Sequence, residues 1–121
     1  MRLFALRGAT DVERDEPQAI LDATTELMQE LARRNGLVPA MTVSCIFTAT
    51  ADLSSEFPAV AARAIGFDRV PLLCAQEIPV PGSMERVIRV LIHYHAEENH
   101  EPTHVYLGAT RALRADLHAA Q

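Results

Sequence analysis

The chain of 121 residues contains no lysine and no tryptophan, so all of its 11 basic residues are arginines. Without lysine there is no Schiff-base chemistry, no lysine anchor for pyridoxal phosphate and no Walker A phosphate loop. The formal net charge of −5 and the lack of a basic run argue against nucleic-acid binding. Arginine remains as the side chain that could recognise an anion, because its guanidinium makes bidentate contacts with carboxylates.

Long apolar runs and cysteine-rich motifs are also missing. No run approaches the roughly 20 residues that cross a membrane. The first segment turns polar after six residues and lacks the apolar core and cleavage site of a secretory signal. Cys45 and Cys74 form no CxxC motif and no disulfide framework. We therefore expect a cytoplasmic protein with reduced thiols that has no membrane partner.

The pattern of apolar residues and turn signals predicts one small domain over residues 1–121, with residues from about 109 onward as a mobile C-terminal tail. A long helix is expected from the N-cap Asp15 to Asn35-Gly36, and a short one from Ser54 or Ser55 to about Ile65, where Gly66 stops it. Strands are expected at residues 2–8, 41–51, 69–76, 86–95 and 103–107.

This order of elements predicts an α+β fold of α/β type, with a mixed five-stranded sheet and both helices on one face. Two helices cannot cover both faces of such a sheet. We expect the uncovered face to meet another copy of the chain.

Arg89 is the most informative candidate because it interrupts the apolar strand Val87–Ile92. It either lies on an exposed edge face, or it is buried with an anionic partner such as Glu77 or a ligand, because an unpaired buried guanidinium costs several kcal/mol, roughly. Arg7 closes the first strand just before Gly8, and taken alone this position favours an arginine that simply reaches solvent from the strand end.

Cys74, Glu77 and Tyr106 lie in or beside the third and fifth predicted strands. Strict alternation points Cys74 and Glu77 to opposite faces, so one site could use both only if the strand bulges or ends between them. Each residue also has an explanation that involves no functional site. Cys74 could be a small buried core residue, Glu77 a solvated loop carboxylate and Tyr106 a half-buried strand tyrosine.

Metal and nucleophilic chemistry find no support in the pattern. His93 and His95 share a strand face, but no third ligand follows at a diagnostic spacing. The motifs GxSxG, HExxH and GxGxxG are absent. We expect no metal, no cofactor and no acyl-transfer triad, and the candidate residues point to a small anionic ligand that bears hydroxyl groups.

Ordered motifs along nearly the whole chain resemble the small monofunctional chorismate mutases of the trimeric α/β-barrel class. Each piece alone is weak, but the ordered set is specific. The matching pieces are Arg7-Gly8-Ala9-Thr10, Val12-Glu13-Arg14-Asp15, Thr48 to Leu53, Phe57-Pro58-Ala59, Val70 to Glu77, Ile88-Arg89-Val90, His104 to Leu107, Leu113-Arg114 and Asp116-Leu117.

The resemblance implies an isomerase of aromatic amino acid biosynthesis, in the shikimate pathway, which rearranges chorismate to prephenate without a cofactor. It implies a homotrimeric pseudo-α/β-barrel with active sites between subunits. Arg89 and Glu77 would be the catalytic residues. The substrate-binding residues would be Arg7, Cys74, Tyr106, Arg63, Arg114, Phe57 and Leu113.

The chain departs from the family pattern near the predicted pocket mouth. Val60 stands where the family often has a lysine, and Leu73 replaces a threonine of the strand. The first change removes a positive charge from substrate capture, so Arg63 would carry more of that task. Two other readings stay open at this point: an imine-deaminase-like enzyme on a similar trimeric fold, and a non-catalytic module that binds a small anion.

Overall fold

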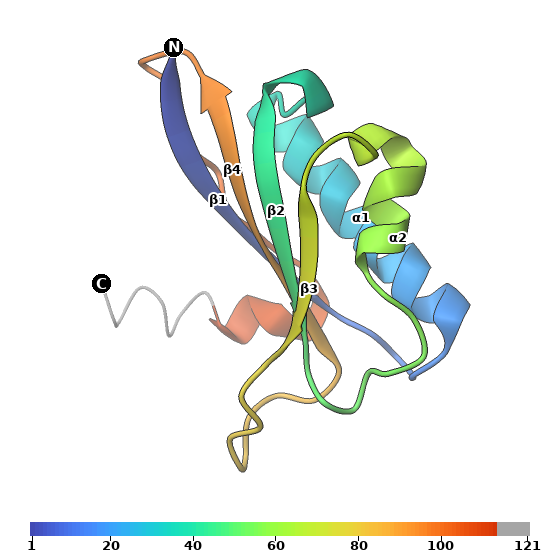
Figure 1. The fold of residues 1–121 in the computed structure, drawn as a ribbon. Coiled ribbons are helices and arrows are strands. Elements are labelled where there is room, and N and C mark those ends of the chain that lie inside the picture. The colour runs from blue at the N-terminus through green and yellow to red at the C-terminus, as the bar shows by residue number, and fades with distance from the viewer. Residues whose placement is uncertain (114–121) are drawn as a thin grey trace.

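The structure is a computed structural model, and it describes residues 1–113. Seven elements follow in the predicted order, together with three short helical turns (Figure 1). They are β1 (Arg2–Asp11), α1 (Pro17–Asn35), η1 (Pro39–Met41), β2 (Thr42–Ala49), α2 (Ala59–Ala62), η2 (Arg63–Phe67), β3 (Leu72–Gln76), β4 (Val87–Ala96), β5 (Val105–Tyr106) and η3 (Gly108–Thr110).

The five strands form one sheet in the order β3-β2-β4-β1-β5. Strand β4 runs antiparallel to both of its neighbours, whereas the β2–β3 and β1–β5 pairs are parallel. Helices α1 and α2 lie on the same side of this sheet (Figure 1). The prediction of a mixed five-stranded sheet with helices on one face is confirmed.

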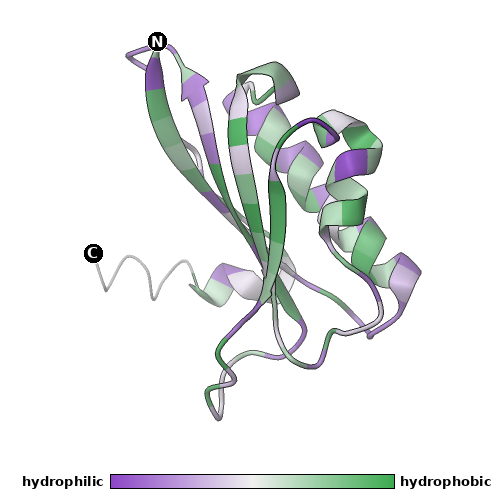
Figure 2. Ribbon diagram, in the orientation of Figure 1, coloured by the Kyte–Doolittle hydropathy of each residue, from purple (hydrophilic) through white to green (hydrophobic). Residues whose placement is uncertain are grey.

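Alternation along each strand separates a core face from an uncovered face. Leu6 of β1, Phe47 of β2 and Ile92 of β4 are fully buried against the apolar side of α1. In Figure 2 the hydrophobic colour runs along the strands, while α1 alternates between the two colours, as one-sided packing requires. The residues that alternate with these core positions along the strands, among them Arg7, Thr48 and Arg89, therefore project from the face that carries no helix.

Gly8 fixes how closely α1 packs on β1. A Cβ at Gly8 would lie 2.8 Å from Cδ1 of Leu31 and 3.2 Å from Cδ1 of Leu27. A side chain at position 8 would therefore force the Leu31 and Leu27 side chains to shift in a closely packed core. The glycine that follows Arg7 thus allows α1 and β1 to pack closely.

The long helix begins one residue later than predicted. Glu16 occupies the N-cap position and makes no side-chain capping bond, so the expectation that Asp15 caps the helix was wrong. The Asp15 carboxylate instead accepts hydrogen bonds from the backbone and hydroxyl groups of Ser54 and Ser55, at 2.7–3.2 Å. These bonds, the Ser55 hydroxyl first, hold the pKa of Asp15 below its ordinary value. The end of the helix agrees with prediction: Gly36 is left-handed, with φ 61°.

The second helix is shorter than predicted, and its proposed caps Ser54 and Ser55 donate to Asp15 instead of capping it. Helix α2 starts at Ala59, after Pro58, and the chain continues as the wider turn η2. Gly66 has φ 114° within that turn, which is why a glycine ends the helical run there. No helix of residues 1–113 is long and apolar enough to cross a membrane.

The predicted tail starts with ordered structure. Gly108–Thr110 form the turn η3, and Thr110 is buried with its hydroxyl donating to the carbonyl of Ala9 at 3.1 Å. Residues 111–113 continue in helical conformation. Arg114, predicted to bind substrate, lies outside the described residues.

Candidate functional site

A hollow of about 320 Å³ lies on the uncovered face of the sheet, and we call it the sheet hollow. Strands β1, β2, β4 and β5 all contribute to its walls. It is lined by Arg7, Gly8, Ala9, Ile46, Thr48, Arg89, Val90, Leu91 and Tyr106. Three of the predicted site residues, Arg7, Arg89 and Tyr106, are therefore brought to one place by the strand register.

Arg89 and Glu77 form an ion pair at the edge of the sheet hollow. The Nε of Arg89 lies 3.0 Å from Oε2 of Glu77, and the Thr48 hydroxyl donates to the same oxygen at 2.7 Å. The Glu77 side chain is 17% exposed, whereas the Arg89 side chain is 48% exposed. The sequence left two explanations for Arg89 open: an exposed face of the strand, or an anionic partner. Both apply, because Arg89 lies on the open face and is paired with Glu77. Its guanidinium is accessible to a ligand.

Glu77 follows the last residue of β3, Gln76, while its backbone N–H still donates to the carbonyl of Ala49 at 2.9 Å. The strand therefore ends between Cys74 and Glu77. Cys74 packs against the buried core. As alternation predicted, the two side chains lie on opposite faces of the sheet.

Arg7 is held at its backbone as well as by its strand. Its N–H donates to Nδ1 of His104 at 3.0 Å, because β5 pairs with β1 only from Gly8 onward and leaves this group free. Burial, followed by the nearby Arg7 charge, lowers the pKa of His104 below its ordinary value of 6.5. A neutral His104 keeps Nδ1 as an acceptor, and this fixes the edge of β1 that carries Arg7.

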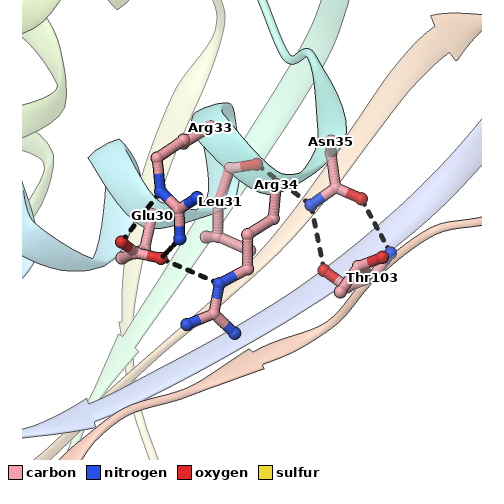
Figure 3. A network of polar contacts seen from close by, with 6 residues as sticks. All are labelled: Glu30, Leu31, Arg33, Arg34, Asn35 and Thr103. Carbon is pink, nitrogen blue, oxygen red and sulfur yellow. Dashed lines mark hydrogen bonds and ion pairs between the residues drawn. The ribbon is translucent and has the colours of Figure 1, made fainter.

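The segment that carries His104 and Tyr106 is tied to the end of α1 (Figure 3). The buried Asn35 side chain donates to the carbonyl of Thr103 at 2.9 Å and accepts from its N–H at 2.7 Å. These two bonds replace the strand partners that residue 103 lacks. The Asn-Gly pair read from the sequence only as a helix stop therefore also positions one wall of the sheet hollow.

The remaining predicted residues lie elsewhere. Phe57 and Cys74 line a second hollow of about 310 Å³ between the segment 53–58 and β3, which we call the loop hollow. Phe57 is exposed, as is Arg63 at the start of η2. Leu113 is half-buried at the end of the described chain. Within one copy, these residues do not join the sheet hollow.

Two residues of the site were not singled out from the sequence: Thr48 and His104. Thr48 pairs with Arg89 across β2 and β4, so only the strand register reveals its place. The bond between His104 and Arg7 depends on where β5 meets β1. Within residues 1–113, no three His, Cys, Asp or Glu side chains gather as ligands for a metal ion.

Two arginines and a tyrosine line one open hollow, and the Glu77 carboxylate is ion-paired to one of those arginines. The chemistry of such a set suits a small anion that carries hydroxyl groups. The set lies on a mixed α+β sheet with one face left open. Comparison with known proteins agrees with this kind of site and identifies the family.

The family model for chorismate mutase type I matches residues 3–117. Chorismate mutase AroH of Thermus thermophilus is 49% identical over 118 residues, which cover 96% of this chain and 97% of that protein. Chorismate mutase AroH of Bacillus subtilis (strain 168) is 37% identical over 119 residues, covering 97% and 94%. The solved structure of a Clostridium thermocellum chorismate mutase superimposes with a TM-score of 0.86 at 41% identity, covering 90% of this chain and 98% of that one. This chain belongs to the chorismate mutase type I family.

Proposed function

We propose that the chain is a chorismate mutase, an isomerase that rearranges chorismate to prephenate on the way to phenylalanine and tyrosine. The observation that carries the proposal is the half-exposed Arg89, paired with Glu77 at the edge of a hollow that also holds Arg7 and Tyr106. Chorismate is a dicarboxylate with a ring hydroxyl and an enol-ether oxygen. These groups match guanidinium donors and a carboxylate acceptor.

Arg89 supplies the electrostatic part of catalysis in this proposal. In the Claisen rearrangement, breaking of the C–O bond runs ahead of C–C bond formation, so negative charge builds on the ether oxygen. A fixed guanidinium that donates to this oxygen binds the transition state more tightly than the substrate. The pairing with Glu77 orients Arg89 before substrate arrives. No nucleophile and no proton transfer is required.

Glu77 accepts from the ring hydroxyl of the substrate, and its charge lies near the part of the ring that becomes positive. Arg7 and Tyr106 hold the side-chain carboxylate and place the enolpyruvyl arm over the ring. This compact shape is a minor conformer in water, so its selection is an orientation effect. The backbone bond of Arg7 to His104, beside the closely packed Gly8, supports that role.

We further propose that the working form is a homotrimer whose sites lie between subunits. The division of the candidate residues supports this: Arg7, Arg89 and Tyr106 line the sheet hollow, while Phe57 and Cys74 line the loop hollow. A neighbouring copy could bring its loop hollow to the open sheet hollow. Arg63, Leu113 and Arg114 would then attract and enclose the substrate. Sedimentation of the purified chain should give three times the monomer mass.

The two thiols, Cys45 and Cys74, are both free, in accord with the cytoplasmic location that we propose.

The activity is tested by incubating the purified chain with chorismate and measuring prephenate, detected as phenylpyruvate after acid treatment. We expect turnover that is lost when Arg89 is replaced. Consumption of an imino acid instead of chorismate would favour the imine-deaminase reading. Tight chorismate binding without turnover would favour a binding module. The family match disfavours both.

A further inference from the structure

Thr48 makes the closest polar contact with the carboxylate that the proposed reaction uses. Its hydroxyl donates to Oε2 of Glu77 at 2.7 Å. Within residues 1–113, this is the only hydrogen bond that the Glu77 side chain receives, and its other contact is the ion pair with Nε of Arg89. Thr48 and Arg89 both contact Oε2 of Glu77, and neither contacts Oε1.

Glu77 needs such an anchor because of its place in the chain. It stands just beyond the end of β3, before the irregular segment 78–86 that returns to β4. Its backbone is fixed by one bond to Ala49, but no further strand residue holds the side chain. A glutamate with three rotatable bonds would otherwise sample several rotamers.

We propose that Thr48 is a positioning residue for catalysis: its hydroxyl locks Oε2 of Glu77 and thereby directs Oε1 toward the substrate hydroxyl. This inference rests on the proposed function and extends it to a residue of β2. Thr48 acts through Glu77 and needs no contact of its own with the substrate.

The topology makes Thr48 suited to this task. Strand β2 lies between β3 and β4, and Thr48 is paired with Ala75 on one side and with Arg89 on the other. Its side chain therefore rises between the carriers of Glu77 and Arg89 on the uncovered face. Among the three polar groups of Thr48, Glu77 and Arg89, the Thr48 hydroxyl is the single neutral one.

Neutrality matters because the guanidinium has a second role. When Arg89 interacts with the ether oxygen and a substrate carboxylate, its charge is shared with those anions and it holds Glu77 less strongly. The Thr48 hydroxyl has no such competing partner among the described residues. Its bond to Glu77 therefore persists through the reaction.

Replacement of Thr48 by valine removes the hydroxyl and keeps a β-branched side chain of similar size. A hydrogen bond to a charged group is worth enough that we expect kcat to fall about ten- to a hundredfold in Thr48→Val. Thr48→Ser restores the donor and should stay within about threefold of the native kcat. KM should change less than kcat, because Arg7 and Tyr106 still bind the carboxylate.

Thr42→Val is the matched control on the same strand. The Thr42 hydroxyl donates to the carbonyl of Val38 at 2.8 Å, with no contact to the sheet hollow. This variant should leave kcat within about twofold of native, since its lost bond lies outside the site. Thermal melting of each variant checks that the fold persists. If Thr48→Val fails to fold, Thr48→Ala against Thr48→Ser gives the same comparison.

A double-mutant cycle separates positioning of Glu77 from a general effect on the sheet. In a Glu77→Ala background, Thr48→Val should lower kcat by less than about twofold, because the side chain that Thr48 positions is already gone. The proposal is overturned if Thr48→Val turns over like native protein, if serine rescues nothing, or if the two losses simply multiply. If native protein gives no prephenate, the proposed function fails first and this inference falls with it.

Discussion

The Nε atom of Arg89 lies 3.0 Å from Oε2 of Glu77, although the two residues come from β4 and from the end of β3, with β2 between them. The fold therefore holds the guanidinium of Arg89 beside the candidate acceptor Glu77. The pair is half open to solvent on the Arg89 side, so a dicarboxylate can approach the guanidinium without displacing Glu77.

Arg89→Lys tests whether the shape of this cation matters as well as its charge. Lysine keeps one positive charge but lacks the planar fork that can donate to the ether oxygen and a carboxylate together. We expect kcat to fall at least about a hundredfold, equivalent to about 2.7 kcal/mol of transition-state stabilisation. Steady-state kinetics with chorismate provides the measurement, and a kcat near the native value would reject the role of Arg89.

Val60 stands where the resemblance predicts a lysine near the mouth of the pocket. It is half-buried in α2, three residues before the exposed Arg63. Val60→Lys should lower KM for chorismate about two- to fivefold at low salt, because an added positive charge raises the local concentration of a dianion. The effect should vanish at high salt, where the charge is screened.

Val60→Met is the matched control for Val60→Lys, since it lengthens the side chain without adding charge. A KM that stays unchanged in Val60→Lys, or that falls equally in Val60→Met, would contradict a charge effect on substrate capture. The kcat should be similar in all three proteins.

Much of the fold could be predicted because its signals are local. The apolar period of α1, the Asn35-Gly36 stop and the order of helices and strands along the chain all follow from neighbouring residues. The boundaries that failed depend on distant partners. Asp15 looks like a helix cap in sequence, yet its carboxylate binds Ser54 and Ser55, some 40 residues away. The same contact engages the two serines that were predicted to cap the second helix, which begins only at Ala59.

The candidate site follows the same rule. Arg89 and Glu77 were identifiable because a charge interrupts an apolar strand and a carboxylate follows another. The contact between Arg89 and Glu77 could not be predicted, because it depends on the strand register that sets Thr48 opposite Arg89. The division of the predicted residues between the sheet hollow and the loop hollow likewise needed the three-dimensional arrangement, because segment 53–58 meets β3 only in the folded chain.

The two cysteines should differ sharply in reactivity. Cys45 is fully buried, and burial raises its pKa to about 12, so it carries almost no thiolate at neutral pH. Cys74 is half-buried and lines the loop hollow. A disulfide reagent such as Ellman's should label one thiol in the native protein at pH 8 and both after unfolding.

Cys74→Ser identifies the reactive thiol, because it should abolish the native-state labelling. Chorismate should slow labelling of the native protein if Cys74 belongs to the substrate site. Rapid labelling of both thiols would contradict the burial of Cys45, and labelling that ignores saturating substrate would separate Cys74 from the site.

His104 should make the stability of the protein depend on pH in a defined window. In the folded state Nδ1 accepts the Arg7 N–H at 3.0 Å, and burial lowers the pKa of His104 below 6.5. The unfolded chain therefore binds this proton more readily than the folded one. The contribution of His104 is complete above pH 6.5 and is lost as the pH falls from there through the lower folded pKa.

His104→Asn isolates that contribution. The amide oxygen of asparagine can accept the same N–H, but it does not titrate in this range. We expect the urea midpoint of native protein to fall, relative to that of His104→Asn, as the pH is lowered from 7.5 to 5, while other histidines cancel in the comparison. Because the same bond fixes Arg7, kcat/KM should fall with it over this window in native protein more than in the variant. A stability difference that stays constant across these pH values would show that folding does not shift the pKa of His104, and it would contradict a role for this bond in placing Arg7.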